Sequence, residues 1–208
     1  MSHGKYIVIE GHDGTGKSTQ VELLRKYLSG QGVDSIAFHE PDGTPIATEL
    51  RAIIVNGALK RSAETNVLLF TAARHEIWHN RALPALNKGT WVIASRNYYS
   101  TLAYQGYGEG VSLDLINSVT HTFTDERYMK PDLAVILSLD DSKEREKRIG
   151  KRGELAAPDT FESRDELFQH DVQAGYLAIA KTNNLPIISA QSSPEIIFEE
   201  IISLLPKA

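Results

Sequence analysis

Short apolar runs alternate along the chain with longer segments whose apolar residues recur every three or four positions. The apolar runs lie at residues 6–10, 33–40, 90–95, 132–140 and 185–189. Because polar and apolar residues do not alternate within them, these runs predict strands that are buried on both faces. The longer segments predict helices at residues 17–30, 44–57, 63–89, 112–123, 141–153 and 165–181, and from residue 194 onward.

Helices that separate buried strands are typical of a parallel sheet covered on both sides. The sequence therefore predicts a three-layer α/β fold around a five-stranded parallel sheet. With 208 residues, of which 41% are hydrophobic, the chain can bury one substantial core, and we expect a single domain. The chain has no internal repeat, and residues 106–110 and 150–159 are predicted to be mobile loops.

Composition narrows the range of functions. A net charge of -5 gives no basic surface for long nucleic acid. The chain has no cysteine, which excludes disulfides, iron–sulfur clusters and thiolate zinc sites. No apolar run reaches the length of a membrane span or a signal-peptide core, so we expect a cytoplasmic protein without a membrane partner.

A glycine-rich segment follows the first predicted strand. Residues 11–18, GHDGTGKS, match the pattern G-x-x-x-x-G-K-[ST] between a strand and a helix. In that setting the backbone N–H groups surround phosphate oxygens, Lys17 supplies charge at the terminal phosphates, and Ser18 offers its hydroxyl to Mg²⁺. The pattern predicts a nucleotide-phosphate site with Ser18 as its metal ligand.

Asp13 is unexpected inside a loop that binds anions, because a carboxylate close to phosphate costs on the order of a few kcal/mol. We expect its side chain to turn toward a hydrogen-bond donor. A sugar hydroxyl of a second substrate is one such donor. The alternative is a solvated aspartate that caps the turn.

Several stretches, in chain order, resemble the thymidylate kinases. They are YIVIEGHDGTGKST from residue 6, EPDGT from residue 40, LLFTAAR from residue 68, SRN from residue 95, STLAYQGYG from residue 100 and FQHDVQAGY from residue 168. The resemblance implies a P-loop NTPase fold with a short mobile lid at about residues 143–164. It also implies a homodimer that transfers the γ-phosphoryl group of ATP to dTMP with Mg²⁺. The ATP-binding residues that it implies are Gly11, His12, Asp13, Gly14, Thr15, Gly16, Lys17, Ser18 and Thr19.

The resemblance also assigns the pyrimidine-binding side chains. Phe70 and Arg74 are four residues apart, so a ring and a guanidinium on one helical face can meet one ligand. Phe70 is expected to stack on the base and Arg74 to bond its carbonyl. A second set shares another helical face: Ser100 or Thr101, together with Gln105, is expected to meet the base edge, and Tyr104 to exclude a ribose 2′-hydroxyl.

Four further positions match the family near the acceptor phosphate and sugar. Arg51 and Arg96 are expected beside the phosphate, and Glu40 is the acid of the family's Glu-Pro turn. Asp13 matches a loop carboxylate that meets the deoxyribose 3′-hydroxyl, which would account for its place in the loop.

Catalysis of this reaction needs no general base, because the attacking atom is already a phosphate oxyanion. Catalysis then consists of aligning the substrates and neutralising charge on the transferring phosphoryl group. We expect Lys17, Arg96 and an arginine of the lid to do this. Residues 147–152 contain four cations, so Arg148 or Arg152 is the expected lid residue. The alternative is an ordinary solvated helix end.

Three positions depart from the family pattern: Ser95 replaces an aspartate, His39 an arginine, and Thr160 an arginine of the lid. Since Mg²⁺ keeps most of its waters, the loss of one acid weakens the ion's binding without abolishing it, while Ser18 and nearby Glu10 remain. We therefore expect an active kinase with a raised Mg²⁺ requirement. Thr160 suggests that Arg152 or Arg164 supplies the missing charge.

Three other functions remain open. Residues 75–79, HEIWH, match the H-E-x-x-H pattern of zinc proteases, but no third ligand is evident downstream. The three departures also allow a nucleotide-binding homologue without catalysis, or a kinase for a broader range of deoxynucleoside monophosphates, including dUMP.

Overall fold

The computed structural model describes residues 3–150, 160–161 and 164–206. Its five strands form one sheet in the order β2-β3-β1-β4-β5, and every neighbouring pair is parallel. The predicted five-stranded parallel sheet is confirmed. The strands are β1 (Tyr6–Gly11), β2 (Ser35–His39), β3 (Trp91–Ser95), β4 (Leu133–Ser138) and β5 (Ile187–Ser189).

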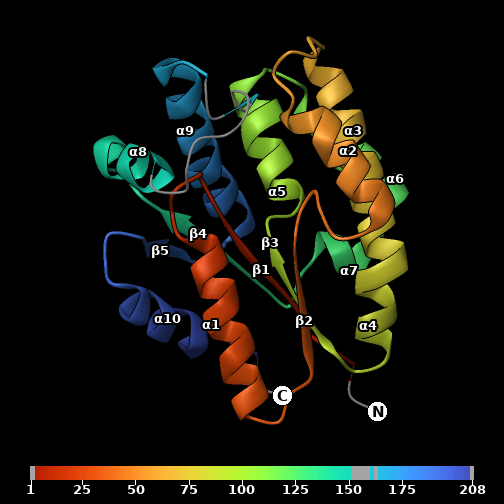
Figure 1. The fold of residues 1–208 in the computed structure, drawn as a ribbon, viewed down its shortest axis with the longest axis vertical. Coiled ribbons are helices and arrows are strands. Elements are labelled where there is room, and N and C mark those ends of the chain that lie inside the picture. Colours follow the sequence, from red (N-terminus) through yellow and green to blue (C-terminus); the bar gives the residue numbers. More distant parts are fainter. Residues whose placement is uncertain (1–2, 151–159, 162–163, 207–208) are drawn as a thin grey trace.

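Helices cover both faces of this sheet (Figure 1). Two of them, labelled η, are wider π-helices. The helices are α1 (Lys17–Gly30), α2 (Pro45–Val55), α3 (Ala63–Ile77), η1 (Trp78–Ala82), α4 (Leu83–Asn87), α5 (Tyr98–Thr101), η2 (Leu102–Gly108), α6 (Leu113–Phe123), α7 (Glu126–Met129), α8 (Ser142–Gly150), α9 (Glu166–Asn183) and α10 (Pro194–Ser203). None of these helices in the described ranges is long and apolar enough to cross a membrane.

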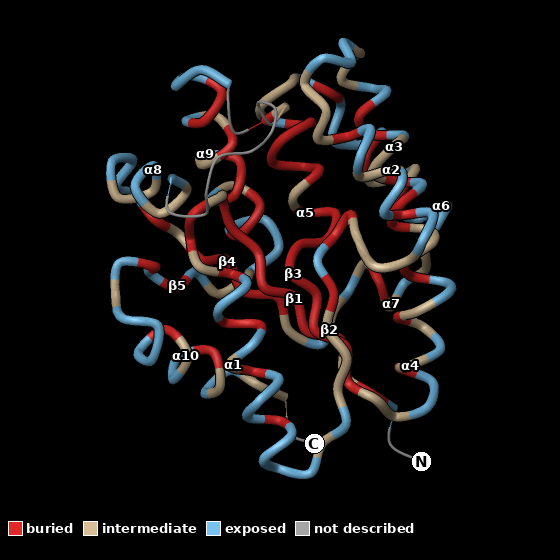
Figure 2. The backbone as a smooth tube through the Cα atoms, in the orientation of Figure 1, coloured by how far each residue is buried: buried red, intermediate tan, exposed pale blue. Residues whose placement is uncertain are grey.

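The central strands are buried on both faces because their side chains alternate between two cores. In β1, Tyr6 and Val8 join the core beneath α3, η1 and α9, whereas Ile7 and Ile9 join the core beneath α1 and α10. Figure 2 shows the resulting buried centre at β1, β3 and β4. The apolar runs of the sequence reflect this double covering.

The predicted helix at residues 63–89 is helical from Ala63 to Asn87, but it changes form before Pro84. Proline cannot donate a backbone hydrogen bond to the preceding turn. The wider turn of η1 ends just before Pro84, which lies in the first turn of α4, so the chain remains helical past the proline with a changed bonding pattern.

The prediction of a mobile loop at residues 106–110 is wrong for residues 106–108, which belong to η2. This helix packs closely on its neighbours: a Cβ at Gly106 would lie 2.4 Å from Leu113 Cδ2, and one at Gly175 would lie 2.8 Å from Tyr107 Cβ. Glycine here permits close packing, which the sequence pattern does not distinguish from a flexible turn. The other predicted loop lies, after Gly150, outside the described residues.

Candidate active site

A cavity of about 180 Å³ opens where β1, β2 and β3 end. Ligands of open α/β sheets bind outside the carboxyl ends of the strands, and this cavity lies there. Lys17 and Ser18 contribute to its wall. The structure also brings together at this wall all ten residues assigned to the acceptor: Asp13, Glu40, Arg51, Phe70, Arg74, Arg96, Ser100, Thr101, Tyr104 and Gln105.

The predicted phosphate loop connects β1 to α1. Gly14 and Gly16 have φ angles of 85° and 91°, in the left-handed region that glycine adopts readily. Lys17 Nζ donates to the carbonyl oxygens of Gly11 at 2.9 Å and His12 at 2.8 Å. The lysine charge is therefore held against the loop in which phosphates are expected.

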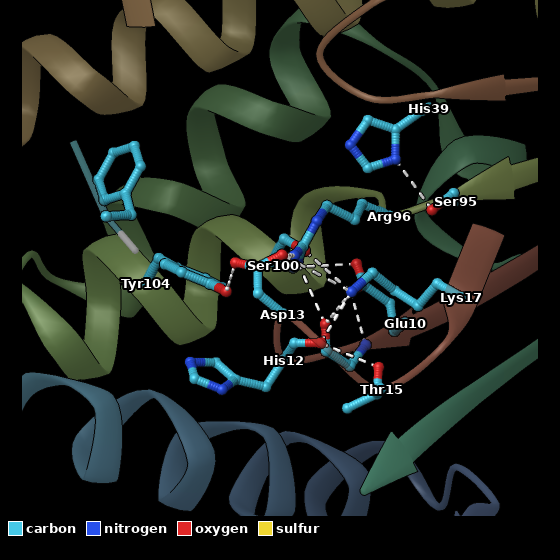
Figure 3. Close-up of polar contacts among 12 residues, drawn as sticks. Glu10, His12, Asp13, Thr15, Lys17, His39, Ser95, Arg96, Ser100 and Tyr104 are labelled. Carbon is cyan, nitrogen blue, oxygen red and sulfur yellow. Dashed lines mark hydrogen bonds and ion pairs between the residues drawn. The ribbon is translucent and has the colours of Figure 1, made fainter. Parts of the chain in front are cut away.

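Asp13 faces hydrogen-bond donors, as predicted, but the donors belong to the protein. Its carboxylate pairs with Nη2 of Arg96 and accepts from the Tyr104 hydroxyl at 2.7 Å (Figure 3). The side chain is 19% exposed, so the alternative of a solvated capping residue is wrong. Burial opposes ionisation, but Arg96 and Lys17 outweigh it and hold the pKa of Asp13 well below its usual range.

Arg96 is brought to Asp13 by the sheet itself. β1 and β3 pair with Ile9 opposite Ser95, so the residues that follow the two strands meet at one edge. Arg96 adopts a φ of 75°, and its Nη1 donates to the Ser100 hydroxyl at 2.9 Å. These contacts fix the guanidinium between the phosphate loop and α5.

Glu10 is fully buried, and its carboxylate oxygens are occupied. They accept from the backbone N–H of Asn97 at 2.7 Å and of Ser100 at 3.1 Å, and from the hydroxyls of Ser100 at 2.8 Å and Tyr176 at 3.1 Å. The expectation that Glu10 supports Mg²⁺ is therefore wrong. The carboxylate instead anchors the start of α5, and with it Ser100.

Arg74 also lines the cavity and is 1% exposed. Its Nε donates to Glu40 at 3.2 Å and to the Tyr128 hydroxyl at 2.8 Å, and its Nη2 donates to Thr101 Oγ1 at 2.9 Å. Nη1 has no hydrogen-bond partner among the described residues. A buried donor without a partner costs free energy, so we expect a ligand to supply a hydrogen-bond acceptor to this atom.

An aromatic wall lies beside Arg74. The Phe70 and Phe161 ring centroids are 6.0 Å apart, and those of Phe161 and Tyr104 are 5.9 Å apart. Phe161 was missed in the sequence, where a single aromatic residue carries no signal of its partners. Its neighbour Thr160 donates to the Ile54 carbonyl at 2.9 Å, which attaches this segment to the end of α2.

The structure does not bring Arg148 or Arg164, the two described arginines predicted for the lid, to the cavity. Arg148 Nε donates to Glu144 at 2.9 Å and its Nη1 to the Ala190 carbonyl at 3.0 Å, so the side chain is directed toward the end of β5. Arg164 contacts Glu109 at 3.4 Å. Arg152 lies outside the described residues.

Arg145 of α8 lies against the phosphate loop instead. A Cβ at Gly14 would lie 3.0 Å from both Cγ and the carbonyl oxygen of Arg145. In the sequence this arginine is one of many charges on the helix, and only the packing of α8 on the loop distinguishes it. Among the described arginines of α8, it has the better position to meet a bound phosphate.

The two histidines of the HEIWH segment share a structural partner. His75 Nδ1 lies 2.8 Å and His79 Nε2 3.2 Å from the carbonyl oxygen of Phe123. The described part of the chain contains no group of three or more His, Asp or Glu side chains that could hold a metal. The segment therefore ties α3 and η1 to the end of α6.

Comparison with known proteins identifies the family. The family model described as thymidylate kinase matches residues 9–201. The chain belongs to the thymidylate kinase family. It is 35% identical over 202 residues to a thymidylate kinase of Carboxydothermus hydrogenoformans, with 97% of each chain covered. It is 32% identical over 206 residues to one of Francisella philomiragia, with 98% of each covered.

A solved thymidylate kinase structure from Ehrlichia chaffeensis superposes on this chain with a TM-score of 0.77 at 29% identity. The match covers 97% of this chain and 98% of the other. The family resemblance and the predicted α/β fold are thus confirmed over nearly the whole length.

Proposed function

We propose that this member of the thymidylate kinase family transfers the γ-phosphoryl group of ATP to dTMP, giving dTDP and ADP. One observation carries the proposal: a single cavity contains all ten predicted acceptor residues together with Lys17 and Ser18 of the phosphate loop. Residues predicted for the acceptor and residues of the phosphate loop thereby border the same cavity.

The base end of the cavity suits a pyrimidine with a carbonyl group. Phe70 offers its ring as a stacking surface, and the unpartnered Nη1 of Arg74 is a charged donor for a base carbonyl. Glu40 and Tyr128 hold the guanidinium in place from behind. Tyr104 is fixed by its hydrogen bond to Asp13, where it can exclude a ribose 2′-hydroxyl.

The phosphate end supplies positive charge. Arg51 lines the cavity and makes no hydrogen bond or ion pair with the residues that the structure describes, so its guanidinium is available to the acceptor phosphate. Arg96 lies on the other side, fixed by Asp13. The acceptor oxyanion attacks the γ-phosphorus in line, and the surrounding cations offset the charge that collects on the transferring oxygens.

The residues present fit Mg²⁺ bound mainly by substrate. Ser18 offers a hydroxyl at the start of α1, whereas the oxygens of Glu10 and Asp13 are bonded to protein donors. Mg²⁺ commonly combines a few protein ligands with phosphate oxygens and waters. When bound, the ion would neutralise phosphate charge, and Ser18 would hold it.

The test is ADP formation from ATP with dTMP, dUMP, dCMP and dGMP, each measured with wild type and with Lys17→Ala. We expect dTMP to be the best acceptor and the variant to lose at least about a hundredfold in rate. Binding of dTMP without turnover would indicate a non-catalytic homologue. Equal rates with dUMP would indicate the broader kinase.

We also propose a cytoplasmic homodimer. Three helices that pack in the order α2, α3, α6 carry exposed apolar side chains. These are Ile46 and Ile53 on α2, Leu68 on α3, and Leu115 and Phe123 on α6. Such an exposed group is typical of an interaction surface. Light scattering of wild type and Leu68→Glu tests this, since a dimer that uses this face should dissociate in the variant.

A further inference from the structure

The carboxylate of Glu109 lies directly after η2, and its side chain is only 10% exposed. Asn66 Nδ2 donates to its two oxygens at 3.2 and 3.1 Å, and Gln105 Nε2 donates at 3.1 Å. Arg164 contacts it from the exposed side. The phosphoryl transfer described above does not use this carboxylate.

An ionised carboxylate can only accept hydrogen bonds, so it determines the orientation of each amide that contacts it. The Gln105 atom that faces Glu109 must be the NH₂ group, which leaves Oε1 at the other side of the amide. Gln105 lines the cavity, and no described residue donates a hydrogen bond to Oε1. Glu109 thus leaves a carbonyl acceptor of Gln105 open to the cavity.

Gln105 and Arg74 are linked through Thr101, which accepts from Arg74 Nη2 and precedes Gln105 by one helical turn. Two adjoining side chains of the cavity wall therefore carry an unpartnered donor, Arg74 Nη1, which is buried in this structure, and an acceptor, Gln105 Oε1. Thymine and uracil carry the complementary pair, a carbonyl oxygen at position 4 and an N–H at position 3. Cytosine carries an amino donor and a bare acceptor nitrogen there.

We propose that Glu109 is a positioning residue for base selection: by orienting the Gln105 amide, it makes the site accept a 4-oxo pyrimidine and reject a 4-amino pyrimidine. The inference rests on the proposed dTMP kinase activity and deepens it. Glu109 acts through Gln105 and need not touch the base.

The experiment compares kcat/KM for dTMP and dCMP in wild type, Glu109→Met and Glu109→Gln. Methionine removes the acceptor and lets the Gln105 amide turn, so the preference for dTMP over dCMP should fall by about tenfold or more. The change should lie in KM for dTMP, with KM for ATP unaltered. Glutamine keeps an acceptor oxygen, so Glu109→Gln should stay within about threefold of wild type. Glu199→Met, at an exposed site on α10, is the matched control.

A folded Glu109→Met variant with wild-type KM for ATP and an unchanged base preference would overturn the inference. If that variant does not fold, calorimetry on the wild type compares the affinity for dTMP with the affinity for N3-methyl-dTMP, which lacks the N–H at position 3. We expect it to bind about tenfold more weakly than dTMP. Equal affinity would overturn the inference. Absence of dTMP turnover in the wild type would instead refute the proposed function, and the inference with it.

Discussion

Ser95 Oγ lies 3.0 Å from Nδ1 of His39, so two of the positions that depart from the family pattern contact each other. They are opposite one another in the register of β2 and β3, at the carboxyl end of both strands. His39 is an exposed residue at the end of β2, where desolvation by its cavity neighbours, followed by the charges of Arg96 and Lys17, lowers the pKa of His39 below its ordinary value. At neutral pH this chain therefore has an uncharged pair where the family pattern has an acid and a base.

Replacing Ser95 by aspartate should restore an acid beside the cavity and lower the Mg²⁺ concentration needed for half-maximal activity by several-fold. An acid at this position can hold waters of the ion, as carboxylates of Mg²⁺ sites do. The measurement is turnover against Mg²⁺ concentration, with Ser95→Asn as the uncharged control of similar size. An aspartate variant with the wild-type Mg²⁺ midpoint would contradict the account of this position.

Among the arginines of α8, Arg145→Ala should lower kcat more than Arg148→Ala. Arg145 lies against Gly14 of the phosphate loop, whereas Arg148 is bonded to Glu144 and Ala190. Loss of one charge that stabilises the transferring phosphoryl group typically costs about a hundredfold or more in rate. Steady-state kinetics with saturating ATP and dTMP decide the order, and a larger effect at Arg148 would mean that α8 moves during the reaction.

Arg96→Ala should destabilise the fold by about 3 kcal/mol, because it leaves the largely buried Asp13 carboxylate without its ion-pair partner. Removing both charges should cost less than the sum of the single changes, since the carboxylate is then no longer unpaired. Urea denaturation of Arg96→Ala, Asp13→Asn and the double variant measures this, with Arg25→Ala on the exposed face of α1 as control. Additive losses would show that the pair contributes nothing.

Stability should decrease as the pH falls below 6.5, in part because of His12. His12 is 2% exposed, and burial lowers its pKa to about 3. The charge of Asp13 opposes this shift, and the charges of Arg145 and Lys17 add to it. The unfolded chain binds a proton near pH 6.5 while the folded chain does not, so the contribution is complete above pH 6.5 and decreases toward pH 3.

Between pH 6.5 and pH 5, the free energy of unfolding should fall by about 1.5 kcal/mol more in wild type than in His12→Gln. Urea denaturation at pH 7.5, 6.5 and 5.0 gives both slopes. The range stays above the titration of Asp13, whose lowered pKa adds a loss of the same sign only at more acidic pH. Parallel slopes for the two proteins would show that His12 titrates normally in the folded state.

The residues proposed to bind the base show which part of the site the sequence predicts. The spacing of Phe70 and Arg74 and the motif that contains them were enough to place both on one face, because helical periodicity is local. Phe161 and Arg145 could not be found in this way. Each comes to the site through contacts with segments distant in the chain, and residue spacing within one helix does not reveal such contacts.

The sequence by itself determined the buried parallel strands, the phosphate loop and the family, because these depend on patterns within short segments and on their order. The tertiary structure alone decided which charges are available. The Glu10 carboxylate accepts hydrogen bonds from the backbone at the start of α5, and Arg148 donates to the carbonyl oxygen of Ala190 after β5. The Gln105 amide is oriented by Glu109. Hydrogen bonds between distant segments determine these outcomes, and a buried polar group takes whichever partner the packing brings to it.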